Sequence, residues 1–371
     1  MSRTTSDPAE LLGRFVADGT IPGGVIALGR DAQPVAVGRA ALEGEPLRTD
    51  AIFRIQSMTK LVTAVVTLLL LEQDRLGLED PVATWLPELA APRALQRPDA
   101  ALTDTAPAPS PITVRHLLTC TSGYGMILQD TPLQRAMTAN RTEAGPEPSP
   151  LGAQDWLDAL ASLPLVGPPG TVWRYHHSFG LLQILLSRLT GAPVAELFAQ
   201  SLFAPLGMSD TGFFVPRQRR DRLPAAYAEQ DGDLVEVEPA GGGFHVGPPP
   251  HDLTHGELLS TAADYLTLLR ALRDGELIAP AHRRMLGSDQ VPSAAKDPAA
   301  FFPGFWETTG WGWGVGVSTV GPHRGRWGWS GGAGTDFFVD PDGTVGLLLT
   351  QVQMGSRLMP LLEAYGELAG N

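Results

Sequence analysis

Cysteine is almost absent from this sequence. Among 371 residues there is one, Cys120, so no disulfide can form within the chain and nothing requires an oxidising compartment. We expect Cys120 to be a small buried apolar residue. Residues 1–19 are polar and then amphipathic, without the apolar core of a secretory signal. These features predict a cytoplasmic protein.

Excess positive charge and long apolar runs are also lacking. The formal net charge of −13 argues against a nucleic-acid partner or an anionic membrane surface, since either needs a concentrated basic face. The longest apolar run, residues 61–71, is too short to cross a bilayer core of about 30 Å. With 43% hydrophobic residues, the chain can bury a large core. We therefore expect a soluble globular protein with no membrane partner.

Lysine is the scarcest charged residue. Of 27 basic residues only Lys60 and Lys296 are lysines, and each follows a serine by three positions, Ser57 and Ser293. A serine hydroxyl becomes a good nucleophile when a neighbour takes its proton, and a lysine amine can do so if its surroundings lower its pKa. Arginine cannot lose its proton. The S-x-x-K pattern therefore suggests a nucleophilic serine with an activating lysine.

The surroundings distinguish the two copies of this pattern. Ser57 and Lys60 begin an almost wholly apolar segment, Met58 to about Asp74, which predicts a helix packed on all sides. In such a helix residues i and i+3 share a face, and burial would lower the pKa of Lys60. Ser293 and Lys296 are flanked by prolines and have no apolar helix behind them. We predict that the second copy is a surface loop.

The order of apolar and turn-forming segments predicts an α/β (α+β) fold. A helix and a hairpin over residues 23–40 come first, and Pro-rich loops then divide residues 91–250 into a mainly helical insertion. We expect residues 1–90 plus 251–371 to form a sandwich of helices flanking an antiparallel sheet. Its later elements are expected to be a helix at 258–276, strands within 310–320, 325–343 and 344–353, and a helix at 356–370.

Further motifs surround Ser57 in sequence order. They are "SMTK", "ITVRHLLTCTSGYG", "PPGTVWRYHHSFG", "LFAPLGMSDTGF", "GELLSTAADYLTLL" and "GWSGGAGTDFFVDP". Together they resemble the serine beta-lactamase-like hydrolases, the group that contains class C beta-lactamases, D-alanyl-D-alanine peptidases and family VIII carboxylesterases. The resemblance covers most of the chain and implies a beta-lactamase-like fold with the site in the cleft between the sandwich and the insertion.

The resemblance also implies roles for individual residues. Ser57 would be the nucleophile, Lys60 its activating partner, and Tyr175 the tyrosine of the family's Y-x-N element, acting as base and then acid. The backbone N–H groups of Ser57 and Gly332 would form the oxyanion hole. This chemistry needs no metal and no organic cofactor.

Two departures from the family pattern bear on the substrate. His177 stands where Y-x-N has asparagine, and the K-T-G or H-T-G element becomes Trp329, Ser330 and Gly331. We expect these four residues to bind substrate, although a plain structural hydrogen bond is an equal alternative for His177. A tryptophan in place of a cation resembles the family VIII carboxylesterases, because beta-lactamases and peptidases hold a substrate carboxylate near that cation.

The sequence therefore predicts a serine hydrolase that acts on small-molecule esters through an acyl-enzyme. The alternatives are an acyltransferase that passes the acyl group to an amine or alcohol, a weak beta-lactamase, and a non-catalytic binding protein on the same scaffold. The sequence does not decide the oligomeric state, and the expected partner is a small ester or acyl substrate.

Two other patterns suggest different sites, a second nucleophile motif and a histidine-rich segment. "GWSGG", residues 328–332, fits a G-x-S-x-G nucleophile elbow, but that fold needs a later histidine and a following helix. The last histidine is His323, and a strand is expected next. The segment 244–257 gathers His245, His251 and His255 without an established metal-ligand spacing. We expect this segment to border the active-site cleft.

Overall fold

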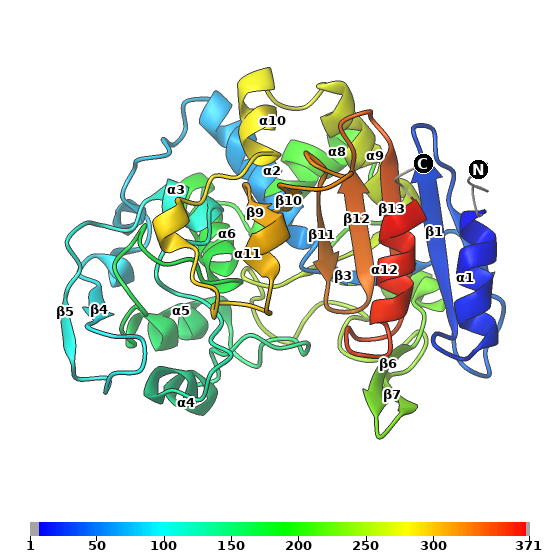
Figure 1. Ribbon diagram of the computed structural model, residues 1–371, viewed down its shortest axis with the longest axis horizontal. Helices are drawn as coiled ribbons and strands as arrows, with labels where there is room; N and C mark the ends of the chain where they lie inside the picture. The colour runs from blue at the N-terminus through cyan, green and yellow to red at the C-terminus, as the bar shows by residue number, and fades with distance from the viewer. Residues whose placement is uncertain (1–6, 369–371) are drawn as a thin grey trace.

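A seven-stranded antiparallel sheet forms one half of the molecule in the computed structural model, which describes residues 7–368 (Figure 1). Its strand order is β2-β1-β13-β12-β11-β10-β9, so β1 from the N-terminal part of the chain pairs with β13 from the C-terminal part. This confirms the hairpin at 23–40 and the antiparallel sheet. The strands are β1 Gly23–Gly29, β2 Val35–Gly38, β9 Thr309–Trp311, β10 Gly316–Ser318, β11 Trp327–Gly331, β12 Thr335–Val339 and β13 Val345–Thr350.

Each face of the sheet is covered by helices (Figure 1). Helices α1 (Pro8–Ala17) and α12 (Met359–Leu368) pack on one face with Ile26 and Leu348, while α9 (Ala262–Asp274) packs on the other with Leu347. This division follows from the pleat, since successive side chains of a strand point to opposite faces. The expected sandwich is thus present.

Helix α2 (Thr59–Glu72) is buried along nearly its whole length, which confirms the buried helix predicted from residue 58 onward. The hydroxyl groups of two threonines inside it donate hydrogen bonds to backbone carbonyls of the same helix. Thr63 donates to the Thr59 carbonyl at 3.1 Å, and Thr67 donates to the Thr63 carbonyl at 2.7 Å. Their polar groups are therefore satisfied within an apolar core. Helix α2 contacts α6, which joins the sandwich to the helical half.

The helical half lies beside the sheet and carries the small hairpin β4–β5, while the hairpin β6–β7 lies below α12 on the sheet side (Figure 1). The expected division at residues 91 and 250 remains a prediction. Within the predicted insertion, residues 91–250, the segment around Tyr227 packs with α1 and α12 in the core on the sheet side. The elements are α3 Val114–Leu118, α4 Pro132–Ala139, α5 Ala153–Ala161, α6 His177–Thr190, α7 Val194–Phe198, α8 Ala204–Leu206, β4 Arg93–Leu95, β5 Thr105–Pro107, β6 Ala226–Gln230 and β7 Asp233–Glu238; the short helices α10 Pro280–Leu286 and α11 Phe305–Thr308 follow α9.

The predicted helix at 258–276 begins too early. Its first residues form strand β8 (Leu258–Thr261), which pairs antiparallel with β3 (Ile52–Gln56), and α9 starts only after Thr261. The Thr261 hydroxyl accepts a hydrogen bond from the N–H of Asp264 and caps the helix. The helix predicted at 356–370 was also placed too early, because α12 begins at Met359. The last two residues of the predicted range lie outside the described residues.

In the part of the chain that the structure describes, no single helix is long and apolar enough to cross a membrane. One pair, His177–Thr190 with Val194–Leu206, is bent by 84° and meets the criterion only when its two helices are taken together, by length and composition alone.

Candidate active site

Ser57 lies between β3 and the first turn of α2, where Lys60 reaches back to it. The Lys60 Nζ donates a hydrogen bond to Ser57 Oγ over 2.8 Å, and the two residues are 3% and 9% exposed. Gln56, just before Ser57, has φ of 40°, a left-handed conformation that costs energy for a residue other than glycine. The structure therefore brings the predicted serine and lysine together at a strained turn.

The electrostatics of Lys60 differ from the sequence prediction. Burial alone lowers the pKa of Lys60, as expected, but the electrostatic interactions with Tyr175 and with Glu257 outweigh burial and raise this pKa above its ordinary value. Glu257 Oε1 lies 3.6 Å from Lys60 Nζ. The predicted lowering of the pKa of Lys60 is therefore wrong. Lys60 is an ammonium group in the resting site, held between a carboxylate and the Ser57 hydroxyl.

Tyr175 reaches the same place from the loop before α6. Lys60 Nζ lies 4.8 Å from the centre of its ring, and its hydroxyl oxygen accepts a 2.6 Å hydrogen bond from Trp329 Nε1. Burial raises the pKa of Tyr175, and the Lys60 charge together with the Ser57 and Trp329 side chains opposes this rise. The structure thus joins Ser57, Lys60 and Tyr175 in one cluster.

Trp329 and Ser330 face opposite sides of β11. Trp329 packs against an aromatic wall that includes Trp311, with ring centres 4.6 Å apart, and it also contacts Tyr175. The Ser330 hydroxyl instead donates to the carboxylate of partly buried Asp336, whose pKa burial raises to about 7. Alternation along the strand explains the difference. Ser330, predicted to bind substrate together with Trp329, therefore points away from the Tyr175 side.

Glycines 331 and 332 lie against the segment that carries Ser57. A Cβ atom on Gly331 would come within 2.3 Å of the Ile55 carbonyl oxygen, and one on Gly332 within 2.5 Å of Gln56 Oε1. Gly331 needs to be glycine because its contact is with backbone, whereas at Gly332 the Gln56 side chain could move aside. Among residues 7–368, the N–H groups of Ser57 and Gly332 donate to no acceptor. They remain available for an oxyanion, the role predicted for them.

Glu257 completes the cluster, and sequence reasoning missed this role. Its Oε1 accepts a 3.4 Å hydrogen bond from the Ser57 hydroxyl, besides its contact with Lys60. The next residue, Leu258, donates its N–H to Thr59 Oγ1 over 2.8 Å, which ties the start of β8 to α2. Only a prediction that β3 pairs with β8 could have revealed this role, because that pairing sets Glu257 beside Ser57.

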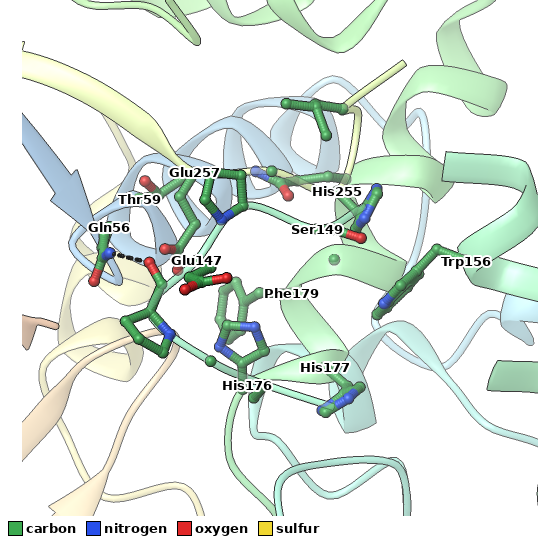
Figure 2. A pocket seen from close by; sticks show the side chains of 18 of the residues that line it. Gln56, Thr59, Glu147, Ser149, Trp156, His176, His177, Phe179, His255 and Glu257 are labelled. Atoms are coloured by element: carbon green, nitrogen blue, oxygen red, sulfur yellow. Dashed lines mark hydrogen bonds between the residues drawn. The ribbon is translucent and has the colours of Figure 1, made fainter. Parts of the chain in front are cut away.

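A cavity of about 560 Å³ opens beside this cluster, and both Lys60 and Glu257 line it (Figure 2). Ser57 lies just beyond its lining. The Pro-rich loop 141–150 closes one side and is tied to the turn that carries Ser57, because Gln56 Nε2 donates to the Pro146 carbonyl at 2.9 Å. The segment 244–257 also contributes to the lining, as predicted.

Histidines form another wall of the cavity (Figure 2). Trp156 stacks between His177 and His255, with ring centres 5.9 and 4.8 Å away. Burial lowers the pKa of both imidazoles to about 4, so both are neutral at physiological pH. His177 is the first residue of α6, not a loop residue, and its Nε2 lies 2.6 Å from the Thr142 carbonyl oxygen. This contact fits the structural alternative weighed for His177, although the residue also lines the cavity.

The structure does not support the alternative site patterns, namely the G-x-S-x-G segment and the second S-x-x-K copy. Residues 328–332 run from β11 into β12 without a helix, so they lack the geometry of a nucleophile elbow. In the second S-x-x-K copy, Ser293 is exposed and Lys296 forms an ion pair with Asp289. Within residues 7–368, no three His, Cys, Asp or Glu side chains are grouped so as to hold a metal ion. Cys120 is buried, as expected.

Comparison with known proteins shows the family of the chain. The family model described as Beta-lactamase matches residues 9–365. An uncharacterized protein of Mycobacterium tuberculosis is 33% identical over 345 residues, covering 88% of this chain and 83% of the relative. Esterase EstB of Burkholderia gladioli is 30% identical over 354 residues, covering 86% and 82%. The solved structure of EstCE1, described as a hydrolase with promiscuous acyltransferase activity, superposes with a TM-score of 0.78 at 25% identity, covering 98% and 97%.

Proposed function

We propose that this chain, which belongs to the beta-lactamase family, hydrolyses esters of small molecules through an acyl-enzyme on Ser57. The observation that carries the proposal is the 2.8 Å hydrogen bond from Lys60 Nζ to Ser57 Oγ, beside a tyrosine whose hydroxyl is fixed by Trp329. The similarity to EstB, an esterase, supports ester hydrolysis as the activity.

In the first half-reaction, Ser57 Oγ bonds to the acyl carbon of the ester. Tyr175 acts in its phenolate form, which the Lys60 charge and the Trp329 hydrogen bond favour: it takes the Ser57 proton and returns it to the leaving alkoxide, so the Lys60–Tyr175 pair ends the step unchanged. The oxyanion that forms in between is held by the N–H groups of Ser57 and Gly332. Positive charge on Lys60 favours this step, since it lies next to the oxygen that loses its proton.

Esters are favoured over beta-lactams because the site has an indole where a carboxylate would need a cation. Trp329 donates its indole N–H to the Tyr175 hydroxyl and packs against the aromatic wall. Arg326, the nearest arginine along the chain, forms two hydrogen bonds with Asp340 at 2.8 and 2.9 Å, so its charge is already paired. A buried carboxylate without a partner costs several kcal/mol.

Acyl transfer is the second candidate. The cavity beside Lys60 and Glu257 has room for an acceptor larger than water. The description of EstCE1 as a hydrolase with promiscuous acyltransferase activity supports the same possibility for this chain.

Product analysis tests the proposal. Purified protein is incubated with short-chain and aromatic nitrophenyl esters, with and without alcohol or amine acceptors, and the acyl products are separated and quantified. We expect free acid to dominate in water, and the Ser57→Ala variant to release none above background. An acylated acceptor as the main product at millimolar acceptor would favour the transferase, and equal release by the Ser57→Ala variant would contradict both.

A further inference from the structure

Glu257 occupies a position that the Ser-Lys-Tyr scheme does not use. Its carboxylate, Ser57 Oγ and Lys60 Nζ form a triangle with sides of 3.4, 3.6 and 2.8 Å. Its first visible effect is electrostatic, since its charge helps to keep Lys60 protonated. A carboxylate within hydrogen-bond reach of the nucleophile can, in addition, exchange protons with whatever attacks there.

The two candidate bases face different surroundings. Tyr175 is 7% exposed, and its hydroxyl is occupied by Trp329 Nε1. Glu257 is 29% exposed in its side chain and lines the cavity, into which its carboxylate points (Figure 2). Tyr175 is not part of that lining. Water that enters from the cavity therefore meets Glu257 first.

From this geometry we propose that Glu257 is the general base of the second half-reaction, in which a water molecule or an acceptor alcohol from the cavity attacks the acyl-enzyme. The inference rests on the proposed function, because it presupposes an acyl group on Ser57. It assigns the two half-reactions to different proton acceptors. The Lys60–Tyr175 pair serves acylation, and Glu257 serves deacylation.

The protons of this step balance around the triangle. The oxygen of water bonds to the acyl carbon while Glu257 takes one of its protons. The tetrahedral intermediate then breaks its bond to Ser57 Oγ, which receives a proton from Lys60 Nζ at 2.8 Å. Lys60 recovers a proton from Glu257 across 3.6 Å. The acid leaves, and all three side chains return to their starting states.

Pre-steady-state kinetics of Glu257→Gln test this inference. With a short-chain nitrophenyl ester, we expect a burst of nitrophenol whose rate stays within about threefold of the parent, followed by turnover at least about a hundredfold slower, as for loss of a general base. Intact-mass measurement should show the acyl-enzyme accumulating. Hydroxylamine attacks esters without needing a base, so it should restore turnover.

Glu196→Gln is the matched control, because Glu196 is exposed on α7 and is not part of the cavity lining. Its turnover is expected to stay within about twofold of the parent. Glu257→Asp tests the geometry in a second variant that keeps the charge: its shorter side chain should slow deacylation more than acylation. Thermal unfolding of each variant establishes that it is folded.

The outcomes separate the inference from the proposed function. If the glutamine and aspartate variants slow the burst and the turnover equally, Glu257 only positions Lys60, and the inference is overturned. Unchanged turnover in both variants overturns it as well. If the parent itself forms no acyl-enzyme on Ser57, the proposed function fails, and the inference fails with it.

Discussion

The indole Nε1 of Trp329 lies 2.6 Å from the hydroxyl oxygen of Tyr175 and donates a hydrogen bond to it. This contact links strand β11 to the loop before α6. A donated hydrogen bond stabilises a phenolate more than a phenol, so Trp329 lowers the pKa of Tyr175 against the rise that burial causes. The residue that replaces the family's cation therefore also adjusts the base.

Replacing Trp329 with phenylalanine removes this donor and keeps an aromatic ring. We expect the pKa of Tyr175 to rise, and kcat/KM for an uncharged ester to fall about tenfold, as for a lost hydrogen bond of about 1.4 kcal/mol. The rise of activity with pH should move to higher pH. Trp327→Phe, also on β11 but packed against Phe337, is the control. An unshifted pH profile in Trp329→Phe would show that the bond does not act on the base.

Replacing Lys60 with arginine tests whether charge alone is sufficient. The guanidinium keeps the positive charge but cannot release a proton, and it must fit a site where Lys60 is 3% exposed. We expect kcat/KM to fall by about a thousandfold or more. Lys296→Arg, at the second S-x-x-K copy, should behave like the parent. Activity of Lys60→Arg within a few-fold of the parent would rule out proton transfer through Lys60.

The missing cation predicts selectivity against carboxylate-bearing substrates. We expect uncharged short-acyl esters to have a kcat/KM at least about a hundredfold above that of penicillins or cephalosporins, a gap of roughly 2.7 kcal/mol. Both constants are measured in the same preparation, with a nitrophenyl ester and benzylpenicillin. Comparable values would instead indicate a beta-lactamase.

The buried carboxyl of Asp336 predicts a pH dependence of stability. Burial raises its pKa from 3.8 to about 7, so between these values the folded state binds a proton that the unfolded chain releases. Stability contributed by this group is present below pH 4 and is lost as the pH rises to 7. We expect the difference in free energy of unfolding between Asp336→Asn and the parent, measured with urea, to shift in favour of the variant by about 2 to 3 kcal/mol from pH 5 to pH 8. The same difference at both pH values would contradict this.

Local patterns in the sequence were sufficient to predict the buried helix and the closeness of Ser57 and Lys60 at its start. The apolar run after Lys60 predicted a buried helix, and the structure places Ser57 and Lys60 in contact at its start. Turn residues and β-branched runs likewise predicted the hairpin and the antiparallel sheet. These features depend on residues close together in the chain.

Features that depend on long-range pairing were not predictable in the same way. Glu257 reaches Ser57 because β8 pairs with β3, about 200 residues earlier, and the apolar residues of β8 resemble the start of the helix that follows. The raised pKa of Lys60 likewise comes from residues distant in the chain, Tyr175 first and then Glu257. Likewise, only the pairing of β11 with β12 sets Ser330 opposite Asp336.

Mapping the covalent adduct tests the central claim most directly. The protein is mixed with a short-chain nitrophenyl ester or a fluorophosphonate, quenched, digested, and the modified residue identified by mass spectrometry. We predict one adduct, on Ser57, that disappears in Ser57→Ala and persists in Ser293→Ala and Ser330→Ala. An adduct on Ser330, or one that survives in Ser57→Ala, would contradict the account.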